Sequence, residues 1–209
     1  MEFNELMRKR RSVNFFDPDK PVDQAVLEKI VEEASMAPSG FNLQPWNLLV
    51  VRSPEVKQRL RKIAWDQPKI EQAPVVLVLL ADKDGWRPEH PVMEKAWQDQ
   101  IDLGYTRSEM REWFDGAARR LFGSDEGSLT FAVRNSCFFG MALMLAAVDA
   151  GLHSHPISGF DHEAMVAELG IPHNFVVPML LAVGHFDQNQ TLGPAKWRKS
   201  FREIVREEL

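Results

Sequence analysis

The sequence predicts an α+β or α/β fold, in which helices flank a small sheet within a single domain. Two observations carry this prediction. Apolar runs of strand length occur at 73–82 and 174–185, and segments with helical periodicity lie before and between them. The 209 residues are enough for one domain with a substantial core.

The first half of the chain is expected to alternate between helix and strand. Residues 23–34 place apolar side chains on one helical face, namely Leu27, Ile30, Val31 and Ala34. Residues 46–51 read as a strand. Ser53 and Pro54 then form an N-cap and N1 pair that opens a helix over 55–64.

The second half contains the most apolar elements. The run 73–82 is continuously apolar, which is typical of a strand that is buried on both faces. Residues 128–151 are apolar nearly all round and end at a glycine, so we expect a buried central helix. A second buried strand is expected at 174–185. Between these elements, 84–127 is polar and Trp-bearing, and we expect it to be helical and peripheral.

Composition excludes several classes of protein. The net charge of −5 argues against non-specific nucleic-acid binding, and the single cysteine, Cys137, excludes an intramolecular disulfide or a multi-cysteine metal cluster. The longest apolar run, 137–148, is too short to span a bilayer, and the first residues lack the apolar core of a signal peptide. We therefore expect a cytoplasmic protein that has neither a membrane nor a nucleic-acid partner.

Two local basic clusters stand out in this acidic chain, at residues 8–11 and 196–202. They could converge on a phosphate group, which arginine forks and lysine charges would neutralise. They could also be a cationic helix end and a solvated tail, and spacing alone favours this second reading. The chain has no GxGxxG and no GxxxxGK[ST] motif, so any phosphate must be held by side chains.

Five motifs occur in an order that resembles the FMN-dependent nitroreductase family. They are RRSVNFFDP at 10–18, APSGFNLQPW at 37–46, the strand APVVLVLL, GLHSHPISGFD at 151–161 and KWR at 196–198. The resemblance covers most of the chain and is weak only across about 84–127. It implies a mixed sheet wrapped by helices, in an intertwined homodimer with two FMN sites at the subunit interface.

The resemblance also implies which residues bind the phosphate and ribityl parts of FMN. Arg10 and Ser12 match an RxS motif, with Arg11 and Asn14 beside them, and Lys196 and Arg198 match a KxR motif that closes on the same phosphate. With this resemblance, convergence of the two basic clusters becomes the favoured reading.

A second set of residues is expected around the flavin ring. The loop residues that match the family's motif are Pro38, Ser39, Gly40 and Asn42, and they would reach the flavin from the partner subunit. Gln44 and Trp46 belong to the same motif, but they could instead serve the loop's own hydrogen bonds and packing.

The segment PISGFD would face the reactive edge of the ring. The backbone N–H groups of Ser158 and Gly159 would lie near flavin N5, next to Pro156 and Ile157. Lys69 matches a family lysine whose charge would stabilise reduced flavin. At the pyrimidine edge the aligned residue is Asp66, but Gln67 is the chemically better donor, so Gln67 is our candidate.

One departure from the family pattern concerns the flavin potential. The position two after Ser12 is often basic in the family, and here it is Asn14. Loss of a cation near the flavin should destabilise the reduced form, so we expect a lower midpoint potential. An Asn14→Lys variant should therefore raise the FMN midpoint.

The remaining candidates have simpler interpretations. Cys137 is expected to be a buried small hydrophobe, and His153 and His155 are expected to lie in a loop without forming a metal site. The aromatic side chains in 84–127 could roof the flavin, but packing is the favoured interpretation. They are Trp86, Trp97, Tyr105, Trp113 and Phe114.

The predicted function is an FMN-dependent oxidoreductase with ping-pong turnover. NADH or NADPH would reduce the flavin and leave, and a nitroaromatic, quinone or related electrophilic small-molecule acceptor would bind to the same face. No side chain stands out as a general acid or nucleophile, which fits chemistry that a cofactor carries. The alternatives are another flavin reaction on the same fold, such as dehalogenation or dehydrogenation, and a non-catalytic flavin-binding protein.

Overall fold

The computed structural model describes residues 2–207, and it confirms the predicted α+β class. One sheet contains four strands in the order β1-β2-β4-β3, and all three pairings are antiparallel. The strands are β1 (Trp46–Val51), β2 (Val75–Asp82), β3 (His153–Ile157) and β4 (Phe175–Gly184). The parallel component expected of a mixed sheet is a single bridge between Ser12 and Ser154.

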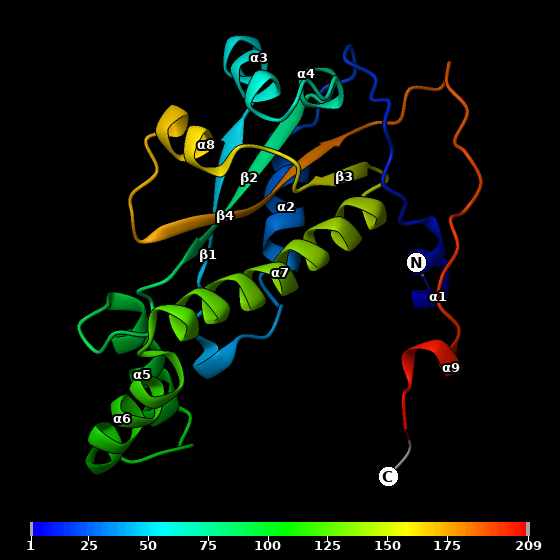
Figure 1. Ribbon diagram of the computed structural model, residues 1–209. Helices are drawn as coiled ribbons and strands as arrows, with labels where there is room; N and C mark the ends of the chain where they lie inside the picture. Colours follow the sequence, from blue (N-terminus) through cyan, green and yellow to red (C-terminus); the bar gives the residue numbers. More distant parts are fainter. Residues whose placement is uncertain (1, 208–209) are drawn as a thin grey trace.

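Helices cover both faces of this sheet (Figure 1). They are α1 (Phe3–Lys9), α2 (Gln24–Ala34), α3 (Pro54–Ile63), α4 (Lys69–Gln72), α5 (Pro91–Asp102), α6 (Arg111–Phe122), α7 (Asp125–Asp149), α8 (His162–Leu169) and α9 (Phe201–Ile204). Two short 3₁₀ turns, Gly40–Asn42 and Ser108–Met110, complete the described elements.

Strand β2 shows why the sheet needs two helical layers. All eight of its residues are buried, and the side chains of residues 75–80 alternate between two core clusters. Val76 and Val78 pack with residues of α3, α4 and α8, whereas Val75 and Leu77 pack with residues of α2 and α7. The continuous apolar run at 73–82 thus corresponds to a strand that is buried on both faces, as predicted.

Helix α7 is the centre of the larger helical layer. It is the one helix in residues 2–207 that is long and apolar enough to cross a membrane, but most of that stretch is buried inside the protein. It packs against α2, α6 and all four strands, as a core helix does. Cys137 on α7 is half-buried, so the expectation of full burial is wrong; burial still raises the pKa of its thiol, which fits an unreactive cysteine.

Two short elements differ from what the sequence predicts. His153 and His155 lie in strand β3 and not in a loop, because His153–Ile157 pairs along its length with Leu180–Gly184. Helix α8 follows directly; the side chain of Asp161 caps it by accepting from Ala164 N at 3.0 Å, and Gly170 ends it with a positive φ of 61°. Both elements are short, and tertiary pairing decides their structure more than local pattern does.

The segment 84–127 is helical and peripheral, as predicted. Helices α5 and α6 form an arm that extends away from the sheet (Figure 1). Trp86, Trp97 and Phe114 are buried in a third core cluster, which supports the packing interpretation for these three. Tyr105 and Trp113 are largely exposed.

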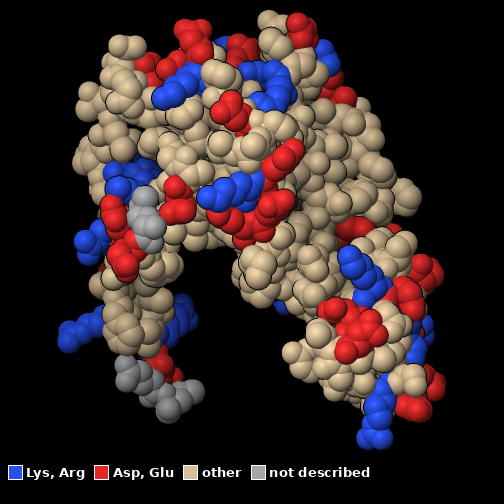
Figure 2. Space-filling model, turned by 180° about the vertical axis from the view of Figure 1, so that it is seen from behind, with Lys and Arg blue, Asp and Glu red and all other residues tan. Residues whose placement is uncertain are grey.

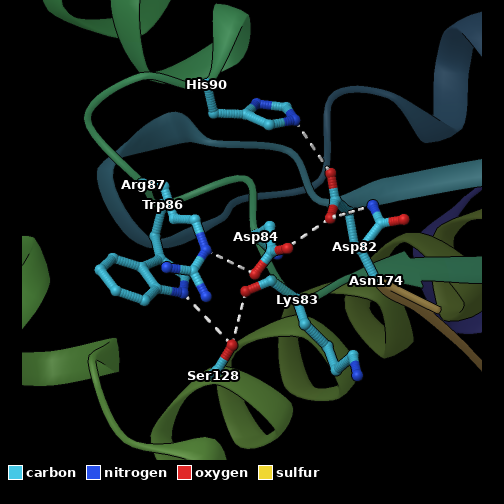
Figure 3. Close-up of polar contacts among 8 residues, drawn as sticks. All are labelled: Asp82, Lys83, Asp84, Trp86, Arg87, His90, Ser128 and Asn174. Atoms are coloured by element: carbon cyan, nitrogen blue, oxygen red, sulfur yellow. Dashed lines mark hydrogen bonds and ion pairs between the residues drawn. The ribbon is translucent and has the colours of Figure 1, made fainter.

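A polar network fixes the arm to the body (Figure 3). The buried carboxylate of Asp82, at the end of β2, accepts from Asn174 Nδ2 at 3.0 Å and contacts His90 Nε2 at 3.2 Å. His90 Nδ1 accepts from Val92 N at 3.3 Å, which caps α5. The Oγ atom of Ser128 on α7 accepts from Trp86 Nε1 at 3.2 Å. The start of the arm is therefore tied to β2, to α7 and to the segment before β4.

Candidate functional site

The N-terminal segment after α1 is held against the edge of the sheet. Val13 N donates to Ser154 O at 3.2 Å, next to the Ser12–Ser154 bridge, and Asp17 N donates to His185 O at 3.0 Å. These bonds attach residues 12–17 to strand β3 and to the chain that leaves β4. They fix the backbone that carries the first basic cluster.

The C-terminal tail reaches the same place from the other end of the chain. The Nη2 atom of Arg11 donates to Gly193 O at 2.9 Å and to Pro194 O at 2.7 Å. In Figure 1 the tail descends beside the N-terminal segment and α1. Arg11 therefore brings the second basic cluster to the first.

Together the two segments enclose a pocket of about 400 Å³, which lies in the range of about 300–1,000 Å³ typical of small-molecule sites. Its lining contains six of the predicted residues: Arg10, Arg11, Ser12, Asn14, Lys196 and Arg198. Convergence of the basic clusters, which the resemblance favoured over the spacing argument, is therefore what the structure has.

The pocket has a strongly positive character. None of its lining residues is acidic, and within residues 2–207 no carboxylate lies within ion-pair distance of Arg10, Lys196 or Arg198. Burial, together with the charges of Arg198 and Arg11, lowers the pKa of Arg10. Cations that are crowded together without counter-charges fit an anionic ligand, and the forked guanidinium groups suit a phosphate.

His155 also lines this pocket, and sequence reasoning did not assign it to the site. Its Nδ1 atom lies 2.8 Å from Val13 O. Burial is the largest cause that lowers the pKa of His155; the bond to Val13 opposes it, and the charges of Lys69 and Lys196 lower the pKa further. The alternation of His153 and His155 could have indicated that both side chains lie on one face of a strand, but not that this face lies beside the basic clusters.

A second group of predicted residues lies around Gly159, two residues beyond the end of β3. Gln67 Nε2 donates to Gly159 O at 2.8 Å and to Ala64 O at 3.1 Å, and its Oε1 accepts from Lys69 Nζ at 3.1 Å. Burial lowers the pKa of Lys69. Gln67 thus connects Lys69 to the backbone of the PISGFD segment, and its amide hydrogens are used within the protomer.

Trp65 is a further residue of this group that the sequence did not reveal. Trp65 and Asp66 have positive φ values of 54° and 59°, which non-glycine residues rarely adopt. A Cβ atom at Gly159 would lie 3.0 Å from Trp65 Cζ3, so this glycine makes room for the indole ring. The carboxylate of Asp66 forms an ion pair with Arg61 at 2.7 Å, so it contacts another side chain of the protomer.

The two groups are joined by strand β3. His155 is in the pocket, and Pro156, Ile157 and Ser158 lead from it to Gly159. β3 ends at Ile157, so at about 3.3 Å per residue the four steps from His155 to Gly159 span at most roughly 13 Å. An elongated ligand with an anionic end in the pocket could therefore lay its other end along the Ser158–Gly159 backbone.

The loop 37–46 does not line this pocket in the protomer. Three of its non-glycine residues, Phe41, Asn42 and Gln44, have positive φ values, of 56°, 54° and 42°. Ser39 Oγ accepts from Gln44 N at 2.9 Å, and Gly40 N donates to Asn135 Oδ1 at 3.0 Å. The loop is thus held in a strained backbone conformation, which is common at ligand-binding sites.

Trp46, the last residue of that motif, serves packing. Its ring stacks on Phe139 of α7, with centroids 5.1 Å apart and an interplanar angle of 2°. It packs against the core cluster on the α2–α7 side of the sheet. Gln44 Nε2 lies within hydrogen-bond distance of Asn42 O and Oδ1, at 3.4 and 3.3 Å. The side chains of Gln44 and Asn42 therefore make hydrogen bonds within the loop itself.

Comparisons with known proteins show the family of the chain. The family model described as "Nitroreductase family" matches residues 7–185. A Thermus thermophilus protein named NADH dehydrogenase is 37% identical over 179 residues, which cover 85% of this chain and 83% of its own. YdgI of Bacillus subtilis, provisionally named an NAD(P)H nitroreductase, is 30% identical and covers 88% of each chain. The chain belongs to the nitroreductase family.

Solved structures support the fold. The crystal structure of YdfN from Bacillus subtilis, provisionally called a nitroreductase, has a TM-score of 0.89 at 27% identity and covers 99% of this chain and 98% of its own. A structure from Exiguobacterium sibiricum, determined in complex with FMN, has a TM-score of 0.84 at 24% identity, with coverage of 100% and 98%. At that identity the second comparison shows the fold alone.

Proposed function

We propose that this protein is an FMN-dependent oxidoreductase that takes electrons from NADH or NADPH and passes them to an electrophilic acceptor. The acceptor class we propose is nitroaromatics and quinones, reduced in a ping-pong sequence. The observation that carries the proposal is the cationic pocket between the N-terminal segment and the tail, in a chain of the nitroreductase family.

The pocket residues fit the phosphate end of FMN. Arg10, Lys196 and Arg198 have no carboxylate partner within residues 2–207, so their charges are available to a phosphate dianion. Ser12 and Asn14 line the same pocket and would hydrogen-bond the phosphate or the ribityl hydroxyls. Arg11 is occupied with the tail carbonyls, so its contribution is to hold the tail closed.

The residues along β3 would position the ring. FMN, when bound, supplies the hydride-accepting and hydride-donating chemistry. The backbone of Pro156, Ile157, Ser158 and Gly159 would lie along the flavin edge, with N–H groups of the last two near N5. The ammonium group of Lys69 is held by Gln67 and would stabilise the negative charge that reduction places on the ring.

A homodimer would complete the site. The predicted loop contacts, from Pro38, Ser39, Gly40 and Asn42, are not in the pocket of their own protomer, and we assign them to the partner's flavin. Figure 2 shows the tail and the α5–α6 arm projecting on either side of a hollow. Exposed apolar residues occur on the tail (Trp197, Phe201), on the arm (Trp113) and on α7 between them (Phe138), which favours a partner subunit seated there.

Two half-reactions measured separately test this proposal. Stopped-flow mixing of the oxidised holoprotein with NADH or NADPH should bleach the flavin without any acceptor. Mixing of the reduced protein with menadione or nitrofurazone should restore it. Steady-state plots should give parallel lines. If only a ternary mixture reacts, the ping-pong mechanism is wrong; if no acceptor of these classes reoxidises the flavin faster than oxygen does, the acceptor class is wrong.

A further inference from the structure

His155 is a titratable side chain among permanent cations in the pocket. Its Nδ1 atom lies 2.8 Å from the carbonyl oxygen of Val13. A carbonyl can only accept a hydrogen bond, so Nδ1 carries the hydrogen of the neutral ring. Nε2 is then left with a lone pair, and it has no hydrogen-bond partner among the described residues. The structure thus fixes both the tautomer and the position of a side chain whose second nitrogen is available to a ligand.

The charges around His155 have one sign. Arg10 and Arg11 from the N-terminal segment and Lys196 and Arg198 from the tail line the same pocket, and Lys69 of α4 also acts on His155. No lining residue is a carboxylate. Together with burial, this environment keeps His155 neutral near pH 7 when the pocket holds no anion.

A phosphate dianion reverses that balance. Its negative charge favours the protonated ring, because an opposite charge within a few ångströms raises the pKa of a histidine. Protonated Nε2 can donate a charge-assisted hydrogen bond, which neutral Nε2 cannot. We propose that His155 is a proton-coupled ligand of the cofactor phosphate: binding of the dianion is accompanied by uptake of a proton on His155. This inference rests on the proposed FMN site.

The coupling makes cofactor affinity depend on pH. Between the pKa of His155 in the free protein and its pKa in the complex, the Kd for FMN rises by up to about tenfold per pH unit. The second ionisation of the phosphate, near pH 6, acts in the opposite direction, so the range from pH 7 to 8.5 isolates the histidine. Lys69, whose pKa burial lowers, and His153 on the same strand are the other groups that could exchange protons there.

Calorimetric titration of the apoprotein with FMN tests the proposal. Titrations at pH 7 in buffers of different ionisation enthalpy give the number of protons taken up. We expect a value approaching one for the wild type and for His153→Gln, and close to zero for His155→Asn, which retains Lys69. The Asn side chain retains an N–H that can donate to Val13 O but cannot be protonated. Riboflavin, which lacks the phosphate, should bind to the wild type without proton uptake.

Affinity provides a second readout. From pH 7 to 8.5 the wild-type Kd for FMN should rise several-fold more than that of His155→Asn. Equal proton uptake in the two proteins, or FMN binding by the wild type without uptake, would overturn the role of His155 and leave the FMN site intact. If the apoprotein does not bind FMN, both proposals fail. Should His155→Asn not fold, the ring resonances of wild-type His155, followed by NMR with and without FMN, must show a raised pKa in the complex.

Discussion

At the residue scale, the site is made of cations that have no counter-charge of their own. Arg10 and Lys196 come from opposite ends of the sequence and line one pocket, and the pKa of Arg10 is lowered by burial and by neighbouring cations. These cations repel one another in the free protein, and a bound anion would reduce that repulsion. Free-energy terms of this kind appear as affinity when the ligand binds.

Removal of one of these cations should weaken the binding of FMN. Each charge-assisted hydrogen bond to the phosphate contributes about 1.5–3 kcal/mol, so Arg10→Gln and Lys196→Gln should each raise the Kd about 10- to 100-fold. Lys29→Gln, which removes an exposed lysine of α2, is the matched control and should leave the Kd unchanged. Fluorescence titration of the apoproteins measures this. An unchanged Kd in both pocket variants would place the phosphate elsewhere.

Arg10 and Lys196 could be predicted from the sequence because they belong to the RxS and KxR motifs of the family. The sequence could not show that Arg11 is occupied by Gly193 O and Pro194 O, because contacts across 182 residues depend on the fold. The same holds for Gln67, whose amide hydrogens go to Ala64 O and Gly159 O. The alternation of His153 and His155 is compatible with a strand, but the pairing of β3 with β4 and the bridge to Ser12, which bring His155 to the basic clusters, depend on the fold.

At the element scale, the edge of the sheet decides where the site forms. Gly184, the last residue of β4, lies against the ring of Pro74 and the side chain of Phe16. A Cβ atom there would lie 2.5 Å from Pro74 Cδ and 3.2 Å from Phe16 Cδ1. The absence of a side chain lets the N-terminal segment pack directly on the sheet.

Gly184→Ala should therefore destabilise the fold, whereas Gly116→Ala should not. Overpacking at this contact should cost about 1–3 kcal/mol in the free energy of unfolding. In Gly116→Ala, within α6, the new methyl group has no atom within 4 Å, and the change should stabilise by about 0.5–1 kcal/mol through helix propensity. Urea unfolding followed by circular dichroism compares the two. A Gly184→Ala protein as stable as the wild type would contradict this view of the edge.

The histidines of β3 should make the apoprotein sensitive to acid. Burial, then the charge of His185, lowers the pKa of His153, and its buried Nδ1 has no hydrogen-bond partner among the described residues. The unfolded chain, with a pKa of about 6.5, therefore binds the proton more tightly. The stability that neutral His153 provides is complete above that pKa and is lost as the pH falls below it.

Replacement of His153 by Phe should flatten this dependence. Between pH 7.5 and 5.5 the free energy of unfolding should fall less in His153→Phe than in the wild type, by up to about 1 kcal/mol. Urea titrations of the apoproteins at both pH values give the comparison. Parallel losses in the two proteins would show that His153 does not contribute.

The main elements were predictable because their hydrophobic patterns are long. The double-sided burial of β2 and the core position of α7 follow from continuous apolar runs. The antiparallel pairing of the four strands and the short helix α8 depend on contacts between distant segments, which local patterns do not specify.

At the scale of the whole molecule, the shape of the protomer favours a second subunit that packs against it. Residues 188–204 of the tail are all exposed, and Trp197 and Phe201 are 70% and 67% accessible. Figures 1 and 2 show the tail and the α5–α6 arm extending from the body. Apolar side chains on extended segments are typical of surfaces that a partner covers.

We expect the protein to sediment as a dimer of twice the chain mass. Trp197→Ala combined with Phe201→Ala should weaken the dimer, because each change removes a large apolar contact from the tail. Lys199→Ala, in the same segment, removes a charge but no comparable apolar area, and it should remain dimeric. Sedimentation velocity over a range of concentrations tests this. If the wild-type protein is monomeric at micromolar concentration, the loop 37–46 cannot contact the flavin of a partner subunit as proposed.

The intertwined dimer was expected from the family resemblance, and a single protomer leaves it a prediction. The loop 37–46 shows why local sequence was insufficient. Its strained backbone and internal hydrogen bonds are explained within the protomer, whereas its predicted contact with flavin depends on a second chain.

The central claim is tested most directly by the visible spectrum of the purified protein, supplied with FMN if needed, before and after anaerobic addition of NADH or NADPH. Our account predicts a protein-bound flavin spectrum that bleaches with at least one of the two nicotinamides. A protein that takes up no FMN would contradict the account, and a bound flavin that neither nicotinamide reduces would contradict the proposed reaction.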